Sequence, residues 1–189
     1  ENLTPPSLIL APHGLLTCVN EMLTLNGSTP LSGIDLSWVT INGSDTTLLE
    51  NGSSVDVTSP GTYHFIGINP VNGCSAIQQT IVTADIVSPI ADAGDAFTLG
   101  CNGAIETLNG SGSSGAAGLG FLWTSSSAVI LSGAATATPS IDEPGLYQVL
   151  VTNPGNGCTD TDEILILSDG PQVSALAIQP ACFGDPGVI

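Results

Sequence analysis

Apolar and polar residues alternate along many short runs of this chain. The run "YQVLV" (147–151) puts Tyr147, Val149 and Val151 on one face, because successive residues of a β-strand point to opposite sides. The run "YHFIG" (63–67) does the same with Tyr63 and Phe65. Gly, Asn, Pro and Ser separate such runs at intervals of roughly 8–12 residues, which is typical of antiparallel sandwiches and barrels. We therefore predict an all-β fold.

The pattern occurs twice along the chain. Cys18, Trp38, Tyr63 and Cys74 correspond to Cys101, Trp123, Tyr147 and Cys158, with offsets of 83 to 85 residues. Matching flanks include "SPGTY" with "EPGLY" and "NPVNGC" with "NPGNGC". Internal repeats of this kind define the architecture. We predict four segments: a linker or strand at 1–7, repeat 1 at 8–86, repeat 2 at 87–170, and at 171–189 the start of a third repeat or a tail strand exchanged between subunits.

Individual elements can be placed in repeat 2. We expect strands near 96–100, 104–109, 119–124, 128–132, 136–141, 145–152 and 158–167. Trp38 and Trp123 fall in the middle of strands and should pack between two sheets, as the buried Trp of an immunoglobulin-like sandwich does. The sequence Asn-Gly-Ser occurs at 26, 42, 51 and 109. It fits the N-glycosylation pattern, but we interpret each Asn-Gly as a hairpin turn.

The second half of the chain carries a family resemblance. The stretches "ADAGDAFTLGCNGAIETLNGSGSS" (91–114) and "FLWTSSSAVILSGAATATPSIDEPGLYQVLVTNPGNGCTDTDEI" (121–164) resemble the PKD-like and Ig-like repeats of very large Bacteroidetes cell-surface proteins. The resemblance covers nearly all of repeat 2 and repeat 1 more loosely, where "LAPHG" (10–14) replaces the "ADAGD" entry. It implies tandem Ig-like or PKD-like antiparallel β-sandwich domains in secreted adhesins, gliding-motility adhesins or extracellular filaments. The implied partners are neighbouring repeats, identical subunits and surface glycans.

The chain has five cysteines, two in each repeat and one in the tail. No C-x-x-C spacing occurs, which argues against a zinc site. In an exported protein we expect one disulfide per repeat, Cys18 with Cys74 and Cys101 with Cys158. This pairing rests on the repeat, and two buried free thiols per repeat are the alternative. Cys182 is then unpaired in this chain, and we expect its partner beyond Ile189 or in another chain.

The charge of the chain limits its partners. There is no Lys or Arg against 17 Asp and Glu, so the formal net charge is −17. Nucleic-acid binding is built on Lys and Arg, and a membrane-spanning helix needs about 20 apolar residues in a row. We therefore predict no nucleic-acid partner, no membrane insertion and an extracellular or cell-surface location.

Catalytic chemistry has little support in the sequence. The two histidines, His13 and His64, lie outside any catalytic motif, and an enzyme needs a convergent set of nucleophile, base or metal ligands. We predict that the protein is not an enzyme and holds no organic cofactor. "DTT" (45–47) resembles the O-glycosylation pattern of Bacteroidetes, which would put a sugar on Thr46.

Calcium is the sharper candidate ligand, because hard cations bind carboxylate oxygens. One group of acids, Asp85, Asp92 and Asp95, surrounds the junction of the repeats. A second group follows NPGNGC, where Asp160 and Asp162 would share one face of a strand. We propose these five as calcium ligands; the alternative is that they are solvated surface acids.

These observations favour a non-enzymatic structural repeat segment of an extracellular bacterial adhesin or surface filament. The alternative is a carbohydrate-binding or ligand-binding accessory module of a secreted hydrolase. That alternative predicts an exposed aromatic platform.

Overall fold

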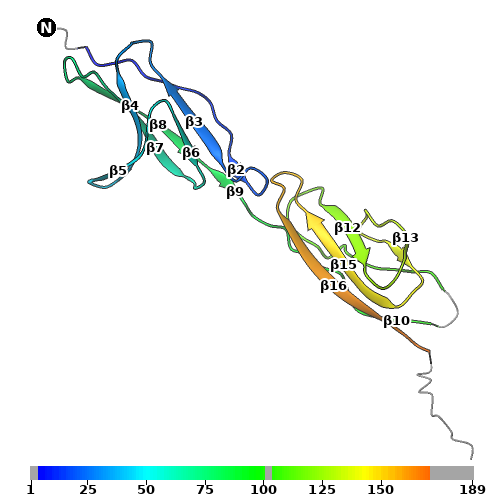
Figure 1. The fold of residues 1–189 in the computed structure, drawn as a ribbon. Helices are drawn as coiled ribbons and strands as arrows, with labels where there is room; N and C mark the ends of the chain where they lie inside the picture. The colour runs from blue at the N-terminus through cyan, green and yellow to red at the C-terminus, as the bar shows by residue number, and fades with distance from the viewer. Residues whose placement is uncertain (1–3, 101–103, 171–189) are drawn as a thin grey trace, which may run out of the picture.

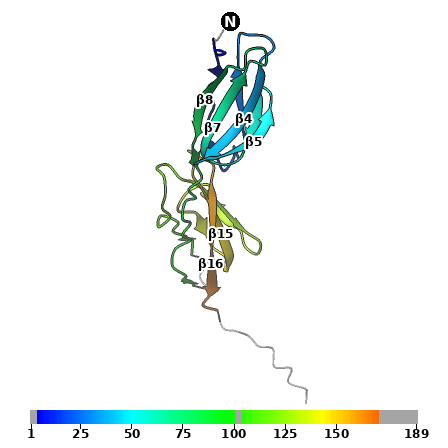
Figure 2. The same ribbon diagram turned by 90° about the vertical axis from the view of Figure 1, so that its left-hand side faces the viewer.

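A computed structural model describes residues 4–100 and 104–170 of the chain. This part consists of β-strands and connecting loops, and it contains no helix long and apolar enough to cross a membrane. Two β units follow one another along the long axis of the molecule, joined by a short extended segment after β9 (Figure 1). A view turned by 90° shows the same end-to-end arrangement (Figure 2). The all-β prediction is confirmed.

Repeat 1 is a sandwich of short strands. A three-stranded sheet has the order β1-β3-β6, and a four-stranded sheet has the order β5-β4-β7-β8. The short strands β2 and β9 form a separate parallel pair. The strands are β1 (Ile9–Leu10), β2 (Leu16–Thr17), β3 (Leu23–Ser28), β4 (Asp35–Asn42), β5 (Asp45–Asn51), β6 (Ser54–Val57), β7 (Gly61–Ile68), β8 (Ser75–Val82) and β9 (Ala84–Asp85).

Repeat 2 has a closely related arrangement. Its sheets have the orders β11-β14-β13 and β10-β16-β15-β12, and β10 pairs with β16 in parallel. Each of the seven runs predicted for this repeat contains a strand. These are β10 (Thr98–Leu99), β11 (Glu106–Thr107), β12 (Gly120–Ser125), β13 (Ile130–Ser132), β14 (Ser140–Ile141), β15 (Gly145–Thr152) and β16 (Thr159–Ser168).

Each repeat buries its own apolar cluster. Trp38 and Phe65 pack with ring centroids 4.9 Å apart in the core of repeat 1. Trp123 is buried in repeat 2, where its Nε1 donates a hydrogen bond to the carbonyl of Thr136 at 3.1 Å. The alternation along β15 is as predicted, because Tyr147, Val149 and Val151 are all buried. The apolar pattern of each repeat therefore builds a separate sandwich core.

Both repeats anchor a tyrosine in the same way. The hydroxyl of Tyr63 donates to the carbonyl of Ser59 at 2.8 Å, and that of Tyr147 donates to the carbonyl of Glu143 at 2.7 Å. A tyrosine bonded to the backbone a few residues upstream is the tyrosine corner of immunoglobulin-like sandwiches. Burial raises the pKa of both phenols, and the charges of Glu143 and Asp142 raise that of Tyr147 further. With the strand order and the buried Trp of each repeat, these corners identify two tandem Ig-like domains.

The Asn-Gly pairs have two different structural roles. Gly43 (φ +64°) and Gly52 (φ +120°) lie in left-handed turns as predicted. The turn prediction is wrong for Asn26–Gly27, which lies within β3. A Cβ on Gly27 would lie 2.5 Å from the ring of Phe65. Glycine is needed here because an aromatic ring lies against the backbone.

Candidate functional site at the junction of the repeats

A disulfide bond joins the two repeats. Cys18 directly follows β2 at the end of repeat 1 that faces repeat 2, and Cys158 lies in the NPGNGC turn between β15 and β16. The two Cα atoms are 5.0 Å apart, although the residues are separated by 140 positions in sequence. The backbone linker and this bond are therefore two covalent connections between the same two domains.

The disulfide prediction within each repeat is wrong, since Cys18 pairs with Cys158. Cys74 precedes β8, whereas Thr17 beside Cys18 pairs with Asp85, 11 residues further along the same edge. Extended chain rises about 3.3 Å per residue, which puts Cys74 on the order of 35 Å from Cys18. A disulfide needs Cα atoms within roughly 7 Å. Among the described cysteines Cys74 is free, and Cys101 and Cys182 lie outside the described residues.

The NPGNGC turn is held by its own hydrogen bonds. The amide of Asn153 donates to the carbonyl of Cys158, and the amide of Gly157 donates to the carbonyl of Asn153, both at 2.8 Å. The side-chain oxygen of Asn156 accepts from the amide of Cys158 at 2.9 Å. Gly157 has φ +72°, a conformation that glycine adopts without steric cost. The tight reversal that the sequence predicts is present, and it fixes the direction of the Cys158 side chain.

This turn contacts repeat 1 and the linker. Asn156 is 1% exposed, and its amide nitrogen donates to the Asp85 carboxylate at 2.8 Å and to the Val87 carbonyl at 3.0 Å. Val19 covers Gly157 so closely that a Cβ on this glycine would lie 2.5 Å from Val19 Cγ1. We call this arrangement the clasp: Cys18, Val19, Asp85 and Val87 on one side, and residues 153–158 on the other.

The acids after the turn hold the first segment of repeat 2. One carboxylate oxygen of Asp160 accepts from the amide of Ala91 at 2.9 Å, and one of Asp162 accepts from the amide of Ala93 at 2.8 Å. Both aspartates lie on β16 with one residue between them, so their side chains share a face, as the sequence predicts. Since Ala93 is fully buried, its amide would otherwise lack a partner. These carboxylates therefore do structural work beside the clasp.

The structure does not bring the five predicted calcium ligands together. Asp85 is bonded to Asn156, Asp92 accepts from the amide of Gly94, and Asp95 is exposed to solvent. Across residues 4–100 and 104–170, no group of three or more His, Cys, Asp or Glu could hold a metal ion. Calcium binding stays a prediction, and a rise in Tm on adding calcium to chelated protein would be its signature.

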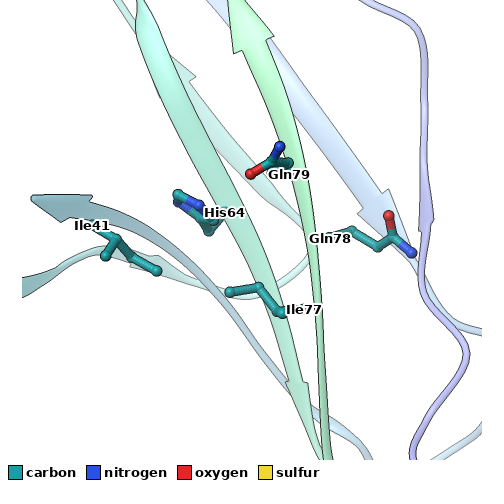
Figure 3. A pocket seen from close by; sticks show the side chains of 5 residues that line it. All are labelled: Ile41, His64, Ile77, Gln78 and Gln79. Atoms are coloured by element: carbon teal, nitrogen blue, oxygen red, sulfur yellow. The ribbon is translucent and has the colours of Figure 1, made fainter. Parts of the chain in front are cut away.

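The largest hollow near a histidine lies on the outer face of the β4–β7–β8 sheet. Its volume is about 310 Å³, and its lining residues are Ile41, His64, Ile77, Gln78 and Gln79. Figure 3 shows Gln78 directed away from Ile77, as alternation along β8 requires. These five residues offer His64 no carboxylate, thiol or hydroxyl, so they form no acid–base pair. The other histidine, His13, contacts the Thr80 hydroxyl through Nε2 at 2.7 Å.

Two further predictions concern the surface and the tail. Thr46 lies on β5, all of whose residues are exposed, so a sugar on this residue would meet no steric barrier. Its glycosylation stays a prediction. The tail at 171–189, predicted to start another repeat or to exchange between subunits, lies outside the described residues.

Comparisons with known proteins found likeness at the level of structure alone. No family model matches the chain, and no curated protein matches it. The matching solved structures include the I67–I69 I-band fragment of titin, with 11% identity, a TM-score of 0.43 and coverage of 87% of this chain and 66% of that one. Domains 3–5 of Drosophila OTK match with 13% identity, a TM-score of 0.43 and coverage of 87% and 62%. Domains 1–5 of Sidekick-1 match with 12% identity, a TM-score of 0.39 and coverage of 85% and 38%.

This chain thus spans between 38% and 66% of the lengths of these multidomain structures. The Ig-like assignment rests on the strand pairing, the buried tryptophans and the two tyrosine corners. The chain consists, over its described residues, of two tandem Ig-like β-sandwich domains joined by a linker and a disulfide.

Proposed function

We propose that this chain is a non-enzymatic spacer segment of an extracellular bacterial adhesin or surface filament. The observation that carries the proposal is the Cys18–Cys158 disulfide between two Ig-like domains. Domains joined by one linker move relative to one another by default. A spacer has to keep its length and direction, and a second covalent connection serves that purpose.

The clasp supports this role in detail. The disulfide fixes one point of contact, and the two hydrogen bonds of Asn156 fix the linker beside it. Val19 fills the remaining space over Gly157. Bending of repeat 2 away from repeat 1 would have to break these contacts while the disulfide stays closed. The junction therefore behaves as a stiff joint rather than a free hinge.

The chemistry of the chain supports an extracellular location. Disulfides form and persist in oxidising compartments and are rare in the reducing cytosol. The surface carries 17 acidic residues and no Lys or Arg, and a net charge far from zero keeps proteins soluble and apart. Neighbouring segments of a filament or adhesin would then repel one another along their sides. Contact would be favoured only where a specific surface such as the clasp forms.

The accessory-module alternative fits the structure less well. Sugar-binding modules commonly present aromatic side chains to solvent, and Trp and Tyr are favoured at such surfaces because of their large amphipathic rings. Within residues 4–100 and 104–170 every Trp, Tyr and Phe is buried or half-buried. The hollow lined by His64 has no aromatic ring besides that imidazole.

Small-angle X-ray scattering of the purified full chain tests the spacer role. Cys18→Ser removes the disulfide, and Cys74→Ser is the matched control because it removes a thiol that forms no bond in this molecule. We expect the control to reproduce the wild-type distance distribution, while Cys18→Ser broadens it. Identical distributions for all three proteins would show that the disulfide does not stiffen the junction. Labelling of intact cells of the source organism with an antibody tests the location.

A further inference from the structure

Repeat 1 carries a second copy of the turn that forms the clasp. In NPVNGC (69–74) the amide of Asn69 donates to the carbonyl of Cys74 at 2.9 Å, and the amide of Gly73 donates to the carbonyl of Asn69 at 2.8 Å. The side-chain oxygen of Asn72 accepts from the amide of Cys74 at 2.9 Å. Gly73 has φ +72°, the same value as Gly157. The two turns therefore share both sequence and conformation.

The surroundings of the two turns differ. In repeat 2 the turn is covered by repeat 1, and Cys158 is 1% exposed. In repeat 1 the turn lies at the end of the domain away from the junction (Figure 1), and Cys74 is a free, half-buried thiol. Two apolar residues near this thiol are exposed, Val71 at 92% and Ile68 at 43%. The end of repeat 1 thus presents a turn of the clasp type with nothing described against it.

We propose that Cys74 is a covalent attachment point for another repeat of this class, supplied by a second copy of this chain. The lone thiol gains its meaning from repeat 2, where the equivalent cysteine of the same turn is seen bonded across a domain junction. The incoming repeat would present a cysteine equivalent to Cys18 and an apolar neighbour equivalent to Val19. This inference rests on the proposed spacer function and names its partner.

The geometry makes such contacts head to tail. In the observed junction the turn of one repeat meets a different surface of the other, the corner after β2. Contacts between two different surfaces are heterologous, and they build rings or open filaments rather than closed dimers. In a second copy, the cysteine of repeat 2 that aligns in sequence with Cys18 is Cys101, which lies outside the described residues. Disulfide-linked copies would therefore extend in one direction.

The bond is formed by an ordinary oxidation. Two thiols lose two protons and two electrons and become one disulfide. Oxidised glutathione can take up the electrons and protons and becomes two molecules of reduced glutathione. The thiolate of one cysteine first displaces one glutathione to give a mixed disulfide, and the second thiolate then displaces the other. No further oxidant is needed.

The test uses the full chain in a buffer of reduced and oxidised glutathione. We expect non-reducing electrophoresis to show a ladder of multimers that collapses on reduction. Cys74→Ser should abolish the ladder, whereas the matched variant Cys182→Ser should leave it in place. Because the chain has no Lys or Arg, peptides for mass spectrometry should be made with pepsin, whose acidic conditions also suppress disulfide exchange. The bonded peptides should join Cys74 of one copy to Cys101 of another.

Three results would overturn the proposal. Cys74 could stay a free thiol while Cys18–Cys158 forms completely. The multimers could persist in Cys74→Ser, or the peptides could join Cys74 to Cys74 or to Cys182, which would exclude a head-to-tail contact of the observed kind. Scattering from the Cys74→Ser monomer separates this failure from failure of the spacer role, because its internal junction remains intact.

Discussion

The disulfide between the repeats should remove most of the chain from the path of a stretching force. A force applied to the two ends enters repeat 1 before Cys18 and leaves repeat 2 after Cys158. The covalent bond between these residues bypasses the 140 residue positions that separate them. In the oxidised protein we therefore expect no domain-sized lengthening when either sandwich unfolds.

The size of the effect follows from the length of the bypassed segment. Fully extended chain spans at most about 3.3–3.6 Å per residue, so 140 positions correspond to roughly 460–500 Å of hidden length. Single-molecule pulling by atomic force microscopy or optical tweezers resolves this difference. Reduction, or the Cys18→Ser variant, should release the hidden length in two unfolding steps, because each repeat has its own core.

Cys74→Ser is the control, since it leaves the Cys18–Cys158 bond in place and should pull like the wild type. The reasoning would be refuted if oxidised wild-type protein gave the same total lengthening as Cys18→Ser. It would also fail if the two domains of the oxidised protein each unfolded with a full-length step, since that would require the force to pass through the bypassed segment.

Three further outcomes are expected. Gly157→Ala should be more destabilising in urea unfolding than Gly73→Ala: both have φ +72°, but a Cβ on Gly157 meets the other repeat whereas one on Gly73 meets nothing within 4 Å; equal losses would contradict the clasp. Asp162→Ala should cost about 1–3 kcal/mol of stability because it leaves a buried amide unpaired, whereas the exposed Asp95→Asn should be neutral; equal effects would remove the role of the carboxylate. Stability should be retained below pH 10 and fall as pH rises past it, because burial raises the folded-state pKa of Tyr147 above its ordinary 10.0 and the unfolded chain ionises first; phenolate absorbance at the ordinary pKa in folded protein would contradict this.

Much of the fold can be predicted from local patterns. The alternation in "YQVLV" fixes which side chains enter the core, because a shift by one residue would turn every apolar side chain outward. The same reasoning places Trp38 and Trp123 inside and His64 on the outer face. Asn26–Gly27 resists such reasoning because glycine serves turns and close packing alike, and only the position of the Phe65 ring decides between them.

The disulfide could not be predicted because a repeated sequence does not say whether cysteines pair within a unit or with its neighbour. Both schemes preserve the same spacing. The deciding fact is that β2 pairs with β9, beyond the far end of β8 from Cys74, which is a tertiary contact between segments far apart in sequence. The roles of Asp160 and Asp162 were hidden for the same reason, since their partners lie 69 residues earlier.

The position of the linker inside the disulfide-closed ring has a consequence for survival outside the cell. Ile86 and Val87 are 60% and 74% exposed, which makes the linker an accessible place for a protease to cut. A cut at these residues falls between Cys18 and Cys158, so the two fragments stay joined through sulfur. A single break anywhere in that interval leaves the ends of the molecule connected, and the segment can carry damage without coming apart.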